Sequence, residues 1–295
     1  MKLWFAFILA LFAALPQAKA CSSCGSGGAD PLVLFPYENL KLLGQLTQQH
    51  GFRDIAYDAS QSRSYGPEKK WLLTTSMAVR LTQKAFASLT LPWHRHQRAD
   101  KEATGFGDPL LTVRYNLLQQ NLLQIYRPQV QFIAAHKKSR SRSIHGSRRF
   151  DNLDVRSNGF DESIFGIDLW FGMSSWIGGA TYLWTAPTSL EHEFGKVERA
   201  AEHRGIITFG YQWEQKLSLI GGWRIRHHSG LRFQGKAQEH SSVEEGSWFV
   251  TAETRLPIAV NYRFTVSEAA SRLDSKQANT ARFWSISLAA IGRLL

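Results

Sequence analysis

The chain has 295 residues, of which 43% are hydrophobic and 12% aromatic, and its formal net charge at pH 7 is +11. This length favours one large domain. After the first 20 residues, no segment of the sequence is long and apolar enough for a transmembrane helix, which excludes membrane-spanning helices from the rest of the chain. The abundance of Gly, Phe and Trp and the small number of Pro are typical of a sheet-rich protein with aromatic girdles.

Residues 1–20 have the pattern of a secretory signal peptide. Lys2 supplies the positive charge, Leu3 to Leu15 form the apolar core, and Ala18-Lys19-Ala20 is an A-x-A cleavage site. We therefore expect Cys21 to be the first mature residue. Two alternatives stay open. A membrane-anchoring helix is one, although the apolar run is short for it. A lipoprotein acylated at Cys21 is the other, although Ala18 and Lys19 make a poor lipobox.

Residues 21–37 are expected to form a periplasmic leader, rich in Cys and Gly at its start, before the first predicted strand. The leader holds the two cysteines of the chain, Cys21 and Cys24. An exported chain reaches an oxidising compartment, so we expect a small disulfide between them. A thiol pair that binds a soft metal is the alternative. A thioredoxin-type redox motif is not favoured, because no βαβ pattern surrounds the pair.

The clearest strand pattern in the sequence runs from Gly105 to His136. Gly105-Phe106-Gly107-Asp108-Pro109 is a turn signal, after which apolar and polar residues alternate up to a second turn at Gln119-Gln120-Asn121. Another alternating run, Tyr126 to Ala134, leads into a basic loop, Lys137 to Arg149. Alternation with a period of two predicts a strand with one apolar and one polar face. Two such strands with a short turn and a long loop make one hairpin of a transmembrane β-barrel.

Ten further segments alternate in the same way, which brings the total to about twelve strands. They are Asn39–Gln49, Trp71–Leu81, Ala85–Trp93, Ser163–Gly172, Trp176–Thr185, Ile206–Glu214, Leu217–His228, Trp248–Arg255, Ile258–Val266 and Ala281–Ile291. Short turns alternate with long polar loops, among them Gly51–Lys70 and Gln97–Thr104. Outer-membrane barrels have short periplasmic turns and long extracellular loops. The sequence therefore predicts an all-β fold, in which residues 38–295 form a closed antiparallel barrel in the cell outer membrane.

A soluble β-sandwich would show the same alternation and is the competing fold. Two features favour the barrel. The predicted strands are longer than those usual in a sandwich. Aromatic residues also gather at the strand ends, as an interfacial belt in a membrane requires. They are Trp71, Trp93, Tyr115, Trp176, Trp184, Trp213, Trp248 and Trp284.

The segment Gly105-Phe106-Gly107-Asp108-Pro109-Leu110 resembles the phenol meta-pathway (MetA-type) family of outer-membrane barrels. That family has a Gly-x-Gly-Asp turn that enters a strand ending in an Arg/Lys-Tyr pair, and Arg114-Tyr115 fits this pattern. The leader, with its Cys21-Ser22-Ser23-Cys24 start, is also similar to uncharacterised proteobacterial barrel proteins. The resemblance implies an outer-membrane channel or transporter of unestablished substrate and carries no catalytic residues.

If the apolar faces meet lipid, the polar faces line the lumen. The charged residues expected there are Arg80, Arg114, Arg127, Asp168, Arg224, Arg226, Glu253 and Arg263. A pore lined mainly by basic residues concentrates anions. The alternative is that these charges pair with one another across a plugged interior and stabilise the barrel.

The histidines all fall in predicted loops or at the outer ends of strands. His94 and His96 share one strand face, and His227-His228 ends another strand. Imidazole is a ligand for borderline divalent metals, so these four residues are the candidate metal site at the mouth. The alternative is a polar rim beside lipopolysaccharide. A lipid hydrolase with Ser229 as nucleophile lacks any local signature, so we expect no enzyme activity.

The function predicted from the sequence is that of a monomeric outer-membrane channel or transporter for a small solute, with a preference for anions and without a cofactor. Lipopolysaccharide is the expected acidic neighbour of the basic loops, and nucleic acid is not expected for an exported chain. The competing interpretation is a plugged structural or binding barrel whose outer loops bind metal or lipopolysaccharide.

Overall fold

The computed structural model describes residue 34 and residues 38–58, 61–119, 128–142, 154, 156–173, 175–192, 195–213, 217–228, 230–237, 242–255, 260–273 and 279–294. Among these residues, no helix has the length and apolar character that a membrane crossing needs. The sequence calls for long strands instead, because its apolar residues recur at every second position.

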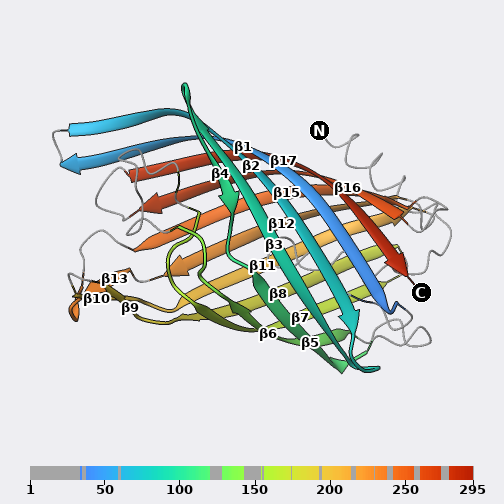
Figure 1. The fold of residues 1–295 in the computed structure, drawn as a ribbon. Helices are drawn as coiled ribbons and strands as arrows, with labels where there is room; N and C mark the ends of the chain where they lie inside the picture. The colour runs from blue at the N-terminus through green and yellow to red at the C-terminus, as the bar shows by residue number, and fades with distance from the viewer. Residues whose placement is uncertain are drawn as a thin grey trace, which may run out of the picture.

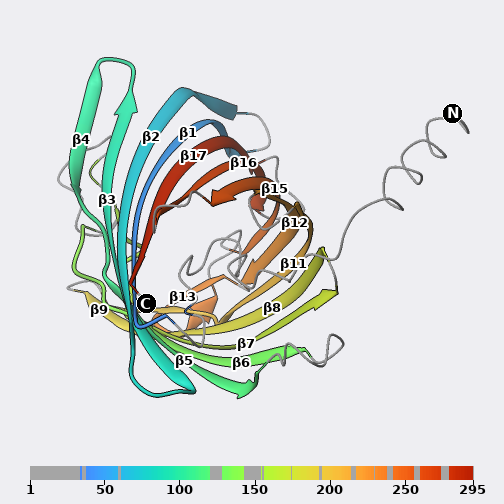
Figure 2. The same ribbon diagram turned by 90° about the vertical axis from the view of Figure 1, so that its right-hand side faces the viewer.

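Within the described part of the chain, twelve strands form one antiparallel barrel, as the sequence predicts (Figures 1 and 2). They are β1 (Leu40–Asp58), β2 (Gln61–Arg80), β3 (Ala85–Arg98), β5 (Leu110–Leu118), β6 (Gln129–Lys137), β7 (Glu162–Met173), β8 (Trp176–Pro187), β11 (Glu202–Trp213), β12 (Leu217–His228), β15 (Val243–Arg255), β16 (Val260–Leu273) and β17 (Asn279–Leu294). The sheet closes because β2 pairs with both β1 and β3. Closure leaves no unpaired edge, which a sheet in hydrocarbon requires.

One position in the barrel wall is made of two strands in succession. The short β4 (Lys101–Phe106) pairs with the C-terminal part of β3, and β5 pairs with the N-terminal part of the same strand. Gly107-Asp108-Pro109 interrupts the ladder between them. Proline has no N–H to donate, which disfavours a continuous ladder at this point. The turn signal in the sequence is therefore an interruption within the wall, and the hairpin turn lies farther out, at Ala99–Asp100.

The two faces of each strand differ as the alternation predicts. On β11, Ile207 is 67% exposed and Phe209 56%, whereas Thr208 between them is 5% exposed. The same contrast holds around the barrel, where large exposed apolar side chains point outward and most of the buried polar ones point inward. An apolar outer surface of this extent fits a hydrocarbon surrounding, since soluble monomers seldom expose large contiguous apolar patches.

Aromatic side chains of nearby strands pack together toward both ends of the barrel wall. Near the short turn after β7, the Trp176 ring lies 5.0 Å from Phe209 and 4.8 Å from Tyr211 between centroids. Toward the other end, Trp248 and Trp284 lie 5.8 Å apart. Clusters at both ends match the aromatic girdles that lie at membrane interfaces.

The prediction of a polar loop at Gly51–Lys70 is wrong. Most of this stretch belongs to β1 and β2, which are 19 and 20 residues long and extend beyond most other strands (Figure 1). The predicted loop Gln97–Thr104 is wrong for the same reason, because β3 continues to Arg98 and β4 begins at Lys101. Strand segments outside the membrane meet water on both faces, so they lack the alternation of apolar and polar residues that indicates a membrane-spanning strand.

The two long loops that follow β8 and β12 form a second, smaller sheet. It has four described strands, β9 (Leu190–His192), β10 (Gly195–Arg199), β13 (Leu231–Phe233) and β14 (Lys236–Ala237), in the order β14-β13-β10-β9. Figure 1 places it at the end of the barrel with the long loops, which is the extracellular end in outer-membrane barrels.

Candidate functional site: the barrel lumen

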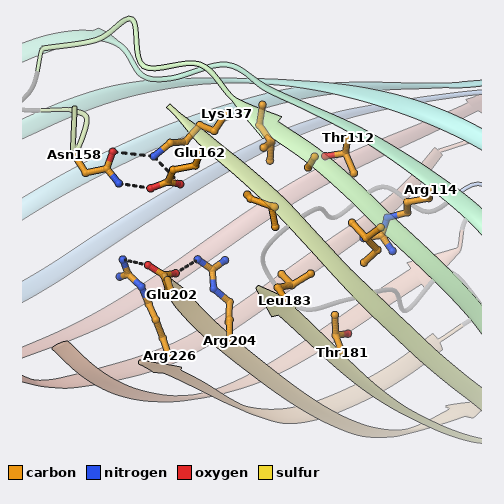
Figure 3. A pocket seen from close by; sticks show the side chains of 14 residues that line it. Thr112, Arg114, Lys137, Asn158, Glu162, Thr181, Leu183, Glu202, Arg204 and Arg226 are labelled. Carbon is orange, nitrogen blue, oxygen red and sulfur yellow. Dashed lines mark hydrogen bonds and ion pairs between the residues drawn. The ribbon is translucent and has the colours of Figure 1, made fainter. Parts of the chain in front are cut away.

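The described residues line two cavities in the lumen. The first, of about 270 Å³, lies against the wall from β5 to β12, and Figure 3 shows it from close by. The second, of about 390 Å³, lies against the rest of the wall, from β11 and β12 through β17 and β1 to β3. The lining residues of the two cavities do not overlap, and their chemistry differs.

The floor of the first cavity is apolar. Gly166 on β7 pairs with Ile133 on one side and with Leu183 on the other, and Ile164 is the previous inward residue of β7. A Cβ atom at Gly166 would lie 2.5 Å from Leu183 Cδ2 and 2.4 Å from the Tyr182 carbonyl oxygen. Glycine is therefore required here, because it leaves room for the flanking side chains to pack over the backbone.

A cluster of charges lies toward the extracellular end of the first cavity. Glu202 accepts hydrogen bonds from Arg204 at 2.8 Å, from Arg226 at 3.0 Å and from Arg199. Figure 3 shows the Arg204 and Arg226 side chains converging on this carboxylate. Arg226 also lies 3.5 Å from Glu245 on β15. Three guanidinium groups therefore surround the buried Glu202 carboxylate.

A second carboxylate, Glu162, links the same cluster to the outer loops. Lys137 lies 3.0 Å from it, and Arg199 of β10 lies 2.7 Å from it. Asn158 donates a further hydrogen bond to Glu162, as Figure 3 shows. Arg199 thus joins the small extracellular sheet to two barrel strands, because it binds both Glu162 and Glu202.

Below the apolar floor lies a buried polar network. Arg114 donates to Asp168 at 3.0 Å and to the Gln131 side-chain oxygen at 3.3 Å. Thr181 donates to the other oxygen of Asp168 at 2.6 Å. Additional hydrogen bonds lower the cost of burying an ion pair, and Gln131 and Thr181 supply two of them.

The second cavity is lined largely by hydroxyl groups. Its Ser and Thr side chains are Thr47, Thr74, Thr90, Thr208, Ser247, Thr251, Thr265, Ser267, Ser285 and Ser287. Arg224 also lines it, with its guanidinium carbon 5.6 Å from the centre of the Phe249 ring. Arg263 lines it as well and binds Glu253 at 2.7 Å, while Asn261 donates to Glu253 at 3.1 Å. This wall offers hydrogen bonds to water and to polar solutes along its length.

The periplasmic end of the lumen is filled by apolar packing. Leu34, which precedes β1, is 1% exposed and packs in a cluster with inward residues of four strands. The strand residues of this cluster are Leu43, Ala78, Phe86, Ala289 and Ile291. Next to it, Glu38 binds Lys41 at 2.8 Å, and Arg80 donates to the Glu38 carbonyl oxygen at 2.8 Å. Residues before the first strand therefore narrow this end.

Asp108, in the interruption between β4 and β5, binds the extracellular loop that follows β6. Its Oδ1 atom accepts hydrogen bonds from the Arg140 and Ser141 amides at 3.0 Å and from the Ser141 hydroxyl at 2.6 Å. Its Oδ2 atom accepts one from the Ser157 hydroxyl. In the same loop, a hydrogen bond from Lys138 lowers the pKa of Asp161. The loop is thus fixed to the wall where the ladder is broken.

Most of the residues predicted to line the lumen lie on its inner side. Four of them line the cavities, which are Arg114, Arg224, Arg226 and Arg263. The other three described ones form hydrogen bonds, Asp168 with Thr181, Glu253 with Asn261, and Arg80 with the Glu38 carbonyl oxygen. Arg127 lies outside the described residues. Sequence reasoning missed five charged residues near the mouth, which are Lys137, Glu162, Glu202, Arg204 and Glu245. Extending the inward parity of each strand past its last apolar residue would have found them.

The structure does not bring the four predicted metal ligands together. His94 and His96 lie on β3, with ring centroids 5.7 Å apart. His227 is an exposed residue of β12, on the far side of the barrel from β3. Among the described residues, no group of three or more His, Cys, Asp and Glu side chains could hold a metal. Metal binding by His94 and His96 stays a prediction.

Several predicted features lie outside the described residues. They are the signal peptide, Cys21, Cys24, the side chain of His228, and Ser229. The disulfide between the two cysteines therefore stays a prediction.

Comparison with known proteins shows the fold and no family. No family model matches the chain, and no curated protein matches it. Among solved structures, an outer membrane channel from Pseudomonas putida F1 is similar over 89% of this chain and 100% of that chain, with 15% identity and a TM-score of 0.67. The translocator domain of the autotransporter NalP from Neisseria meningitidis matches over 87% of this chain and 88% of its own, with 14% identity and a TM-score of 0.49. By its fold, this chain is an outer-membrane β-barrel.

Proposed function

We propose that this chain is an outer-membrane channel that passes a small solute through its lumen and prefers anions. The carrying observation is the charge of the lining. Among the described residues that line the two cavities, six are cationic and three are carboxylates. The cations are Arg114, Lys137, Arg204, Arg224, Arg226 and Arg263, and the carboxylates are Glu162, Glu202 and Glu245. Asp168 and Glu253 bind Arg114 and Arg263, so one net positive charge remains when these two carboxylates are included. Fixed positive charge along a narrow path raises the local concentration of anions.

Two further points support transport as the role of the lumen. The Pseudomonas putida F1 protein with this fold is described as an outer membrane channel. The Gly105–Asp108 sequence and the Arg114-Tyr115 pair resemble the MetA-type transporter family, and no residue of this motif specifies a solute. The proposed route runs from the charged cluster of the extracellular end, past the hydroxyl-lined wall, to the Leu34 cluster.

Planar-bilayer recording tests this proposal. In a potassium chloride gradient, the purified chain should give reproducible conductance steps with a reversal potential of the sign that indicates anion selectivity. Arg224→Gln should shift the reversal potential toward zero, because it removes one lining charge. Lys236→Gln removes a charge from exposed β14 and should leave the potential unchanged. Steps with cation selectivity would overturn the anion preference.

A plugged structural barrel is the second candidate. Its supporting observation is that the inner charges are bonded to one another, as in Arg114–Asp168 and Arg263–Glu253, while Leu34 fills the periplasmic end. Such a barrel would bind lipopolysaccharide with its basic loops, where Arg140 and Arg142 lie. A folded preparation that stays silent in the bilayer at all voltages would favour this candidate over the channel.

A further inference from the structure

We infer that the first cavity binds a small carboxylate with a compact apolar body, such as an aromatic or short-chain alkyl acid. This inference rests on the proposed function, because it names a solute class for the same lumen. The argument starts from one row of inward residues that pair with one another across five strands. The row is Ile133, Gly166, Leu183, Arg204 and Arg226.

The first part of the row is apolar. Ile133 and Leu183 lie on either side of Gly166, and Ile164 lies next to it on the same face. All three side chains line the cavity in a lumen whose other inward positions are mostly polar. Because Gly166 carries no side chain, Leu183 packs over its backbone, and Ile133, Ile164 and Leu183 together bound this part of the cavity with hydrocarbon. An apolar group bound in this part of the cavity is removed from water, and this burial makes the binding free energy more favourable.

The second part of the row is cationic. Leu183 pairs directly with Arg204, and Arg204 pairs with Arg226. Both arginine side chains keep part of their surface open, 26% for Arg204 and 32% for Arg226, while each gives a bond to Glu202. A guanidinium group has several N–H donors in one plane, so a ligand carboxylate can be bound beside Glu202. Lys137, at the extracellular end of the cavity, is paired with Glu162, so the two arginines beside Glu202 are the groups that would bind the carboxylate.

The size of the cavity limits the ligand. A volume of about 270 Å³ lies just below the range of small-molecule sites, which is roughly 300–1,000 Å³. Apolar surface and guanidinium groups are next to each other in the row, so charge and hydrocarbon must also be adjacent in the ligand. A benzoate ion has this shape. Acetate lacks the apolar body, and benzyl alcohol lacks the charge.

Calorimetric titration of the full mature chain in lipid nanodiscs tests the inference with these three compounds. Benzoate should bind at least about tenfold more tightly than acetate or benzyl alcohol, since each of the two lacks one half of the interaction. Equal affinities for benzoate and acetate would show a general anion site and overturn the inference. Equal affinities for benzoate and benzyl alcohol would also overturn it.

Matched variants locate the site. Arg204→Gln should lower the affinity for benzoate about tenfold and leave the affinity for benzyl alcohol unchanged. Arg204→Lys should bind benzoate more tightly than Arg204→Gln does. Leu183→Asn should lower the affinity for both aromatic compounds. The shift of its gel mobility on heating checks that this variant is folded. Arg224→Gln is the control, because it removes a charge from the second cavity. An equal loss of benzoate affinity in Arg224→Gln and Arg204→Gln would overturn the assignment to the first cavity.

Bilayer recording of the same preparations separates this inference from the proposed function. Anion conductance without any benzoate binding would overturn the inference and keep the channel. Benzoate binding in a barrel that is silent at all voltages would keep the binding site and overturn the channel.

Discussion

The Arg114 guanidinium lies 3.0 Å from the Asp168 carboxylate, although β6 runs between the strands that carry these two residues. Gln131 of β6 accepts a hydrogen bond from Arg114, and Thr181 of β8 donates one to Asp168. Four neighbouring strands are therefore joined across the inner face by one polar network. Because both charged side chains are almost fully buried, the network stabilises the barrel only while both partners are present.

Removing one partner of this pair should destabilise the barrel strongly. We expect Asp168→Ala to lower the free energy of unfolding by about 3–5 kcal/mol, because it leaves the Arg114 charge buried without its carboxylate. Urea-induced unfolding in detergent micelles, followed by tryptophan fluorescence, measures the loss. The double variant with Arg114→Met and Asp168→Leu should recover most of it. A single variant as stable as the parent chain would refute the energetic role of the pair.

A positive charge on the middle of the outer face should destabilise the barrel in lipid. Ile207 lies midway along β11 and is 67% exposed. An arginine at the bilayer midplane costs about 2–4 kcal/mol, so Ile207→Arg should lower the unfolding free energy by this amount. Leu217→Arg is the control, because Leu217 begins β12 beside a short turn, where the cost is about 0–1 kcal/mol. Equal small effects at both positions, measured in lipid bilayers, would mean that water surrounds the outer face.

The Asp108 carboxylate should protect the extracellular loop after β6 from proteases. Asp108→Ala removes the acceptor for Arg140, Ser141 and Ser157, so the loop should open more often. We expect trypsin to cut this loop about tenfold faster in the variant, as followed by mass spectrometry of the fragments. Asp100→Ala changes an exposed carboxylate in the turn between β3 and β4 and should leave the rate unchanged. An unchanged rate in Asp108→Ala would exclude this carboxylate as the anchor of the loop.

A charge in place of Leu34 should open the periplasmic end. Leu34 packs against inward apolar residues such as Phe86 and Ile291. A carboxylate cannot stay in this apolar cluster without a large desolvation cost, so Leu34→Asp should release the segment before β1. The single-channel conductance of Leu34→Asp should rise above that of the parent chain, whereas Leu34→Met should keep the parent value. Identical conductance in Leu34→Asp and the parent would place the narrowest point elsewhere.

The sequence by itself determined which side of each membrane-spanning strand faces outward. Alternation is a local property, since successive side chains of a strand point to opposite faces, and residues such as Ile207 and Thr208 follow it directly. The strand number follows as well, because each run of alternation has turn or loop residues at both ends. The closed all-β barrel could therefore be derived from the chain without any knowledge of its contacts.

The tertiary structure alone decided which inward residues meet. Arg114 and Asp168 become partners because register and curvature bring distant parts of the chain together on one face. Arg199 reaches Glu162 and Glu202 because the outer loops fold into their own small sheet. No periodic pattern in the sequence predicts this sheet. The polar ends of β1 and β2 carry no alternation, so pairing between neighbouring strands is what extends them above the membrane. Long-range pairing depends on the whole closed sheet, whereas alternation depends only on neighbouring residues in the chain.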